Sequence, residues 1–265
     1  LNILCLMDPK FMYKALFDVS AETIKELSKD KKYLGAKIGF TSVLHTWGQN
    51  LSLHPHIHMI VPGGGIDSNG KWKNSKKKFF LPVKVVSKLF KGKFLSYTKK
   101  NFDQRKIKDE EQFQNIINTC YSKDWVVYTK KPMKSAKHVV KYLGRYTHRI
   151  AISNARIKKY EDNKVTFSYK DYSDHNQIKE MTLDDTEFFR RYMMHVLPPN
   201  FMKIRHYGFL GNRNKEERIK AVRTATNTKN PGPLLIDYEQ IISDILKRDV
   251  SICIKCGQKR HYQLE

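Results

Sequence analysis

Two histidines separated by a single residue are the densest group of metal-binding side chains in the sequence. They are His56 and His58, in the segment 54–58 with the sequence HPHIH. The apolar run that follows predicts a β-strand, and residues i and i+2 of a strand project from the same face. Two imidazoles on one face can chelate a metal ion. An isolated pair is often only hydrogen-bonded surface histidines, but here an apolar strand and three glycines follow it, so we favour a metal.

A two-histidine pair is an incomplete metal site, and a third ligand is expected from the neighbouring strand or its turn. The candidates are Gln49, His45 and His54, and we rank Gln49 first because it begins the predicted loop before the pair. A site of two histidines and one amide oxygen, with open positions, suits Mg²⁺ or Mn²⁺ bound to a phosphate. It does not suit a closed structural zinc site.

Two tyrosines four residues apart are the candidate nucleophiles. The segment 135–148 reads as a helix, and at about 100° per residue Tyr142 and Tyr146 lie one turn apart. They fall between an apolar stripe and a flank that carries Arg145 and Arg149. A phenol with its ordinary pKa of about 10 is a poor nucleophile. Nearby arginines and a metal-polarised phosphate would favour the phenolate, and the product would be a phosphotyrosine ester.

The two tyrosines differ in how easily packing explains them. Tyr146 borders the apolar stripe and is compatible with a purely structural role, whereas Tyr142 lies nearer the arginine flank. We therefore expect Tyr142 to attack first.

The charge of the chain predicts a polyanionic partner. Its 265 residues include 50 Lys and Arg against 26 Asp and Glu, a formal net charge of +24. The stretches 68–102 and 125–160 contain no acidic residue, which favours surfaces that face phosphate. Hydrophobic residues make up 40% of the chain, which is too many for a disordered basic tail.

Other classes are disfavoured by the same inventory. No apolar run approaches the roughly 20 residues of a membrane-spanning helix. Four cysteines do not form a disulfide framework in a chain of this size, so a reducing compartment is expected.

Further groups of cations beside aromatic rings suggest contacts with single-stranded DNA, where bases stack and phosphates pair with cations. The predicted nucleic-acid contacts are Lys141, Arg145, Arg149, Arg205, His206, Tyr207 and Arg213.

The elements that would position these residues alternate between helix and strand. Helices are expected at 8–29, 82–100, 109–121, 135–148 and 184–196, and strands at 37–47, 56–61, 125–129, 164–169 and 177–182. Several hairpin-like connections predict an α+β fold with a largely antiparallel sheet. We expect a catalytic domain at 1–198 and a basic extension at 199–265, with a linker at 224–233 and a final helix at 234–247.

Three long segments resemble the HUH two-tyrosine rolling-circle transposases of bacterial insertion sequences. They are residues 45–65 (HTWGQNLSLHPHIHMIVPGGG), 142–154 (YLGRYTHRIAISN) and 204–213 (IRHYGFLGNR), and the resemblance covers about residues 12–213. It implies an HUH-endonuclease-like fold, in which the histidine pair lies on the central strand of a four- or five-stranded antiparallel sheet flanked by helices. The catalytic tyrosines lie on a nearby helix.

The resemblance also implies a mechanism. A divalent ion on His56 and His58 polarises the scissile phosphate of single-stranded DNA. One tyrosine attacks to give a 5′-phosphotyrosine link and a free 3′-OH, and the second serves the next strand transfer. The implied partners are the transposon ends and the target, and the implied location is the bacterial cytoplasm, in association with the nucleoid.

One departure from the family concerns zinc. Members of the family carry a cysteine-rich zinc-binding region before this core, and the start at Leu1 suggests that such a region is missing from this sequence. Cys253 and Cys256 are either half of a zinc knuckle or two free tail cysteines.

Three other functions remain open on the sequence. A plasmid replication initiator or relaxase would use the same chemistry, but the tyrosine spacing favours a transposase. A non-catalytic nucleic-acid-binding protein is disfavoured by the intact histidine and tyrosine pairs. A zinc hydrolase would need further His and Asp ligands, and the only later Asp-His pair, Asp174-His175, falls in a predicted turn.

Overall fold

The chain folds into two compact units in the computed structural model, residues 1–226 and 227–265. The first unit extends beyond the boundary expected at residue 198, and the division falls inside the segment expected to be a linker. The structure describes all residues except 77–79, 104, 105, 108, 131, 132, 134, 135, 148, 149, 231, 233–239, 241, 245, 246, 255 and 260–265; for 136, 137, 141 and 145–147 it describes the backbone alone.

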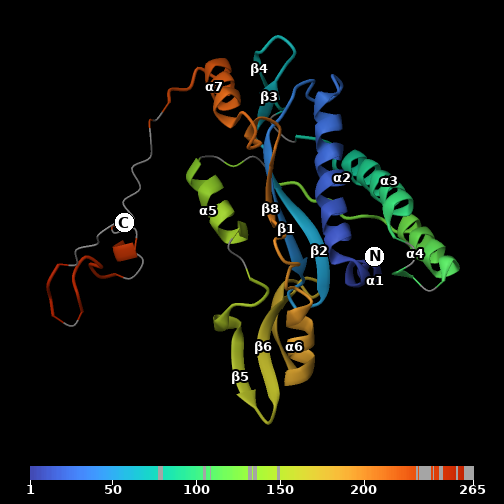
Figure 1. Ribbon diagram of the computed structural model, residues 1–265, viewed down its shortest axis with the longest axis vertical. Helices are drawn as coiled ribbons and strands as arrows, with labels where there is room; N and C mark the ends of the chain where they lie inside the picture. The colour runs from blue at the N-terminus through green and yellow to red at the C-terminus, as the bar shows by residue number, and fades with distance from the viewer. Residues whose placement is uncertain are drawn as a thin grey trace. The chain divides into compact units, whose positions relative to one another are not determined.

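A three-stranded antiparallel sheet forms the centre of the first unit (Figure 1). Its strands are β1 (Phe40–Trp47), β2 (Leu53–Ile60) and β8 (Ile204–Tyr207), in the order β2-β1-β8. The predicted α+β class with an antiparallel sheet flanked by helices is therefore confirmed. The histidine pair was expected on the central strand of the sheet. The structure corrects this expectation: β1 is the middle strand of this sheet, and the pair lies on β2 beside it.

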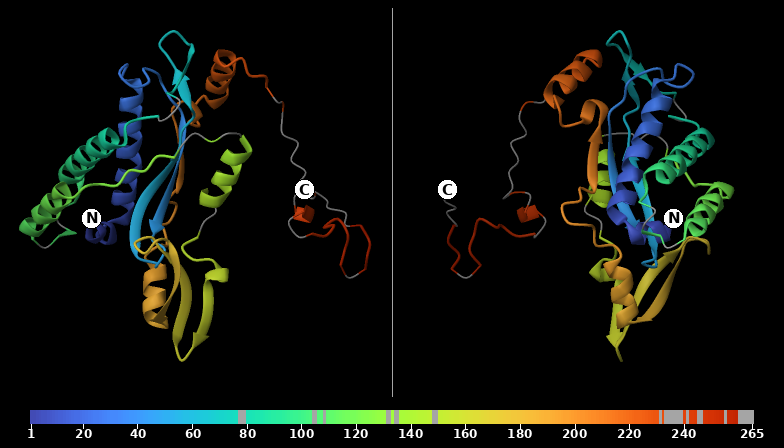
Figure 2. Two further views of the ribbon diagram at one scale, coloured as in Figure 1. Left: turned by 180° about the vertical axis from the view of Figure 1, so that it is seen from behind. Right: turned by 45° about the vertical axis from the view of Figure 1, so that its right-hand side comes forward.

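In the part of the chain that the structure describes, four helices lie on one side of this sheet (Figures 1 and 2). They are α1 (Asn2–Met7), α2 (Pro9–Lys29), α3 (Val83–Asn101) and α4 (Glu110–Ser122). Helix α2 begins sharply because Asp8 accepts a hydrogen bond from the backbone N–H of Phe11 and Pro9 fits the first helical position. Its buried face, including Met12 and Phe17, packs with Leu44 of β1 and Leu95 of α3 in one hydrophobic core.

The segment 125–129, predicted as a strand, is irregular instead. The indole of Trp125 packs between Phe90 and Phe94 and donates to the carbonyl of Cys120. Val126 and Tyr128 are 94% and 78% exposed. The packing of the Trp125 indole, and not the β-forming composition of the segment, therefore determines the backbone conformation here.

Helix α5 (Ala136–Thr147) lies on the opposite face of the sheet from α2 (Figure 1). This is the helix that carries the two candidate tyrosines.

The chain after α5 forms a smaller module around a second antiparallel sheet. Its strands are β5 (Ile157–Glu161), β6 (Lys164–Asp171) and β7 (Gln177–Asp184), preceded by the short helix η2 (Asn154–Arg156) and covered by α6 (Asp185–Met193). The β6–β7 hairpin was predicted, whereas β5 was not. Phe167 and Phe188 pack in the core of this module.

The remaining elements of the first unit are short. They are the hairpin β3 (Gly64–Ile66) and β4 (Trp72–Asn74), the turn η3 (Gly208–Leu210) and the helix α7 (Lys215–Ala225). Gly208 joins β8 to η3 with φ +60°, and a Cβ there would lie 1.8 Å from the carbonyl oxygen of Ile38. Only glycine fits this approach.

In the second unit, Ile252 and Lys259 form an isolated antiparallel bridge around a turn in which Gly257 N–H donates to the carbonyl of Cys253. Within the described parts of the chain, no helix has both the length and the apolar character needed to cross a bilayer.

Candidate metal and tyrosine site

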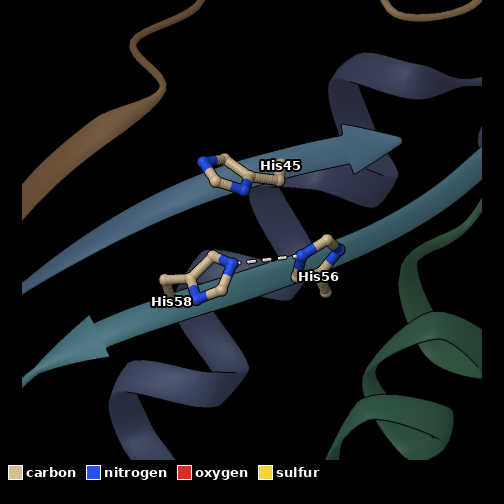
Figure 3. A group of neighbouring side chains, drawn as sticks. All are labelled: His45, His56 and His58. Atoms are coloured by element: carbon tan, nitrogen blue, oxygen red, sulfur yellow. Dashed lines mark hydrogen bonds between the residues drawn. The ribbon is translucent and has the colours of Figure 1, made fainter. Parts of the chain in front are cut away.

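Three histidines meet on the face of the central sheet that α5 faces (Figure 3). They are His45, His56 and His58, and one ring nitrogen from each lies within 4.8 Å of the other two. The strand register places His45 opposite His56, and the two-residue repeat of β2 places His58 on the same face. Among the residues that the structure describes, this is the only group of three or more His, Cys, Asp or Glu side chains that could hold a metal ion.

In the pair formed by His56 and His58, one ring nitrogen of each histidine is directed at the other. His56 donates from Nδ1 to the carbonyl oxygen of His54 at 2.7 Å, so its Nε2 carries the lone pair. That Nε2 lies 3.2 Å from Nε2 of His58. Ligating histidines typically donate their second ring N–H to a carbonyl in this way. The donor set therefore fits a divalent cation.

His45 is the third histidine of the group, although the sequence ranking put Gln49 first. His45 is 1% exposed. Its ring stacks on Trp47 with centroids 4.7 Å apart, and its centroid lies 4.6 Å from that of the His58 ring. The amide of Gln49 donates to the hydroxyl of Tyr172 at 3.4 Å. A hairpin symmetric around residues 48–52 pairs Trp47 with Leu53 and would pair His45 with Pro55. The register shifts by one residue between Trp47 and His45, and this irregularity places His45 opposite His56. The spacing in the sequence gave no signal for this shift.

The loop between β1 and β2 is held by side chains that sequence reasoning missed. Arg156 donates to the carbonyl of Gln49, Arg191 to that of Asn50 at 3.2 Å, and His195 to that of Leu51 at 3.1 Å. Three consecutive carbonyls are thus bound by side chains from η2, from α6 and from the segment after α6. Isolated arginines and a histidine outside any motif gave no sequence signal for this role.

Leu51 fixes the same loop through packing. It has φ +61° and is fully buried in the core of the smaller module, beside Phe167. His195 is also buried, which lowers its pKa, and Thr46 Oγ1 lies 3.3 Å from its Nδ1. The smaller module therefore positions the end of β1, directly after His45 and Trp47.

Tyr142 extends from α5 to the histidines. Its hydroxyl lies 3.4 Å from Nδ1 of His58, and the ammonium of Lys130 lies 5.6 Å from the centre of its ring. Tyr146 follows one turn later on the same helix, but its side chain lies outside the described residues, as do those of Lys141 and Arg145. Arg149 is also outside them.

The residues predicted for DNA contact on β8 divide between the two faces of the sheet. His206 is exposed on the histidine face, where Thr41 Oγ1 lies 2.9 Å from its Nδ1. Arg205 and Tyr207 point toward α2, where Arg205 lies over Phe17 and Tyr207 stacks on Phe40. Although His206 is exposed, partial desolvation of its imidazole lowers its pKa, and the charge of Lys215 adds to this effect. Burial raises the pKa of Tyr207.

Three further residues singled out in the sequence are not members of the histidine group. Arg213 is exposed in the turn before α7. Cys253 and Cys256 lie in the second unit and are not joined in a disulfide.

Comparison with known proteins identifies relatives over most of the chain. The family model Y2_Tnp, described as "Putative transposase", matches residues 39–218. The chain is 40% identical over 268 residues to "Putative transposase y4qJ" of Sinorhizobium fredii, covering 96% of this chain and 67% of that protein. It is 29% identical over 259 residues to "Transposase for insertion sequence element IS801" of Pseudomonas savastanoi pv. phaseolicola, covering 96% and 62%. No solved structure matches the chain significantly.

Proposed function

Because the chain belongs to the Y2_Tnp family of transposases, we propose that it cuts and rejoins single-stranded DNA by tyrosine-mediated strand transfer, as in rolling-circle transposition. The observation that carries the proposal is the contact between the Tyr142 hydroxyl and His58, within a group of three histidines. A nucleophile and a cation site in contact are the two parts that this chemistry needs.

The metal would be held by His45, His56 and His58, and Mg²⁺ or Mn²⁺ would leave coordination positions open for a phosphate oxygen. When bound, the ion supplies Lewis-acid polarisation of the scissile phosphate. Gln49, the third ligand expected from the sequence, is proposed as a further ligand through its amide oxygen; its amide nitrogen donates to the hydroxyl of Tyr172.

Tyr142 is the proposed nucleophile. Its oxygen forms a bond to phosphorus while the bond from phosphorus to the 3′ oxygen breaks. The phenol loses its proton, and the departing 3′ oxygen gains one. The product is a 5′-phosphotyrosine ester and a free 3′-OH, so the phosphoester is conserved for rejoining.

Tyr146 is the proposed second nucleophile, because it follows Tyr142 by one helical turn. Two tyrosines on one helix allow a second strand to be attacked while the first remains linked. Lys141, Arg145, Arg149, His206 and Arg213 are proposed contacts to the DNA.

A covalent-capture experiment tests the proposal. The protein is incubated with Mn²⁺ and single-stranded oligonucleotides tiled across the ends of the insertion sequence, then run on a denaturing gel. A label at the 3′ end should stay on the protein, and a label at the 5′ end should leave with the free 3′-OH.

The controls separate the roles of the residues. EDTA, His56→Ala and the double variant Tyr142→Phe/Tyr146→Phe should abolish the adduct, whereas Tyr128→Phe, at an exposed tyrosine, should retain it. Wild-type protein that binds the oligonucleotides but never links to them would overturn the proposal and favour a DNA-binding role alone.

A further inference from the structure

A basic cavity lies on the α2 side of the central sheet, across the sheet from the three histidines. Its volume is about 250 Å³, and its lining includes Lys10 and Lys14 of α2, Arg205 of β8, and Asn200 and Phe201 from the loop before β8. The strand alternation separates the two sites, because Arg205 and the neighbouring His206 project from opposite faces of β8.

The charges of this cavity are not balanced. Asp18 is the carboxylate that pairs here, with Lys14 at 2.5 Å and Arg205 at 3.7 Å. Three cations against one carboxylate leave two positive charges in excess. An anion is therefore the ligand that this cavity fits.

The guanidinium of Arg205 is already ordered. Its central carbon lies 4.3 Å from the centre of the Phe17 ring and 5.2 Å from that of Phe201. Its Nε is buried without a hydrogen-bond partner among the described residues. Two aromatic rings thus fix the planar fork of an arginine, the geometry that suits phosphate oxygens. Little side-chain entropy would be lost when a phosphate binds.

We propose that this cavity binds a phosphodiester of single-stranded DNA outside the segment held at the histidines. The inference rests on the proposed DNA substrate and adds a second contact on the other face of the sheet. β8 is an outer strand of the described sheet, so DNA reaching His206 on one face passes Arg205 at the edge. Cations beside Phe201 and the exposed Met202 match the mixture of charge and apolar surface found in single-strand sites.

The test removes the two exposed lysines and leaves the packed arginine intact. Affinity of Lys10→Ala/Lys14→Ala for a long fluorescent oligo(dT) is measured by anisotropy over a series of salt concentrations. The matched control is Lys29→Ala/Lys31→Ala, which removes the same charge at the far end of α2.

The expected result is a loss of affinity of about tenfold for the cavity variant and a smaller loss for the control. The slope of log affinity against log salt should fall by about 0.7 for each phosphate contact removed. Equal affinities and equal slopes for the two double variants would overturn the inference.

A second readout separates this inference from the proposed function. A short oligonucleotide that covers only the cleavage site should still form the covalent adduct with Lys10→Ala/Lys14→Ala at an unchanged rate. Loss of that adduct in the cavity variant would place the lysines in the reaction itself and overturn the inference. If wild-type protein forms no adduct but the cavity variant still loses affinity for oligo(dT), the inference about the cavity is supported and the proposed strand transfer is overturned.

Discussion

The hydroxyl of Tyr142 lies 3.4 Å from Nδ1 of His58, although 84 residues separate the two in the chain. The contact joins α5 to β2 on the face of the central sheet that carries the three histidines. A proposed nucleophile and a proposed metal ligand therefore meet only because the helix crosses that face.

Removal of His45 should weaken metal binding more than removal of Gln49. His45→Ala should lower Mn²⁺ affinity at least about tenfold, because one of three convergent imidazoles is lost, whereas Gln49→Ala should have a smaller effect. Titration calorimetry with Mn²⁺ measures both. A larger effect for Gln49→Ala would restore the ranking made from sequence.

Leu51→Ala should destabilise the protein by about 2–5 kcal/mol, because a fully buried side chain leaves the core of the smaller module. Urea unfolding measures the change. The control is Ile178→Ala on the same module, where the side chain is 79% exposed and a change within about 0.5 kcal/mol is expected. Similar losses for the two variants would show that Leu51 does not anchor the loop.

Arg156→Ala should slow covalent adduct formation and lower stability. Its guanidinium donates to the carbonyls of Gln49, Ser168 and Ala151, so the loop after β1 loses its support. The unpaired carbonyls should cost about 1–3 kcal/mol in urea unfolding. Arg156→Lys should not restore the adduct rate, because a single ammonium does not reproduce a planar fork. Full activity of Arg156→Lys would show that charge alone suffices.

The stability of the protein should fall in mild acid through His195. Burial lowers its folded pKa, so between that value and the unfolded value of about 6.5 the unfolded chain binds more protons. The contribution of His195 is thus fully present above about pH 6.5 and is lost as the pH falls through the folded pKa. His195→Gln should flatten the pH dependence of urea unfolding below neutrality. The exposed control His175→Asn should leave it unchanged, and an unaltered slope in His195→Gln would contradict the assignment.

Two glycine substitutions should have opposite effects. Gly208→Ala should disrupt the junction of β8 and η3, because its Cβ would meet the Ile38 carbonyl at 1.8 Å and φ is +60°. Gly92→Ala, in the middle of α3 with open space around it, should raise the free energy of unfolding by about 0.5–1 kcal/mol. Thermal unfolding of both variants, compared with the wild-type protein, tests this prediction. A Gly208→Ala protein as stable as the wild type would contradict this geometry.

Local patterns sufficed for much of the fold. The spacing of apolar residues predicted α2, α3, α4 and the β6–β7 hairpin to within a few residues, because period and end signals are written in contiguous residues. The segment 125–129 shows the limit. It has the composition of a strand, but the packing of Trp125 against α3 keeps it irregular.

The sequence by itself determined the parts of the candidate site: a histidine pair on one strand face, two tyrosines one turn apart, and a surplus of positive charge. Only the tertiary structure decided which parts meet. Strand pairing brought His45 beside His56, and α5 brought Tyr142 to His58. The alternation of β8 sent His206 and Arg205 to opposite faces. These relationships join residues far apart in the chain, and their positions depend on packing against other elements, which no local pattern encodes.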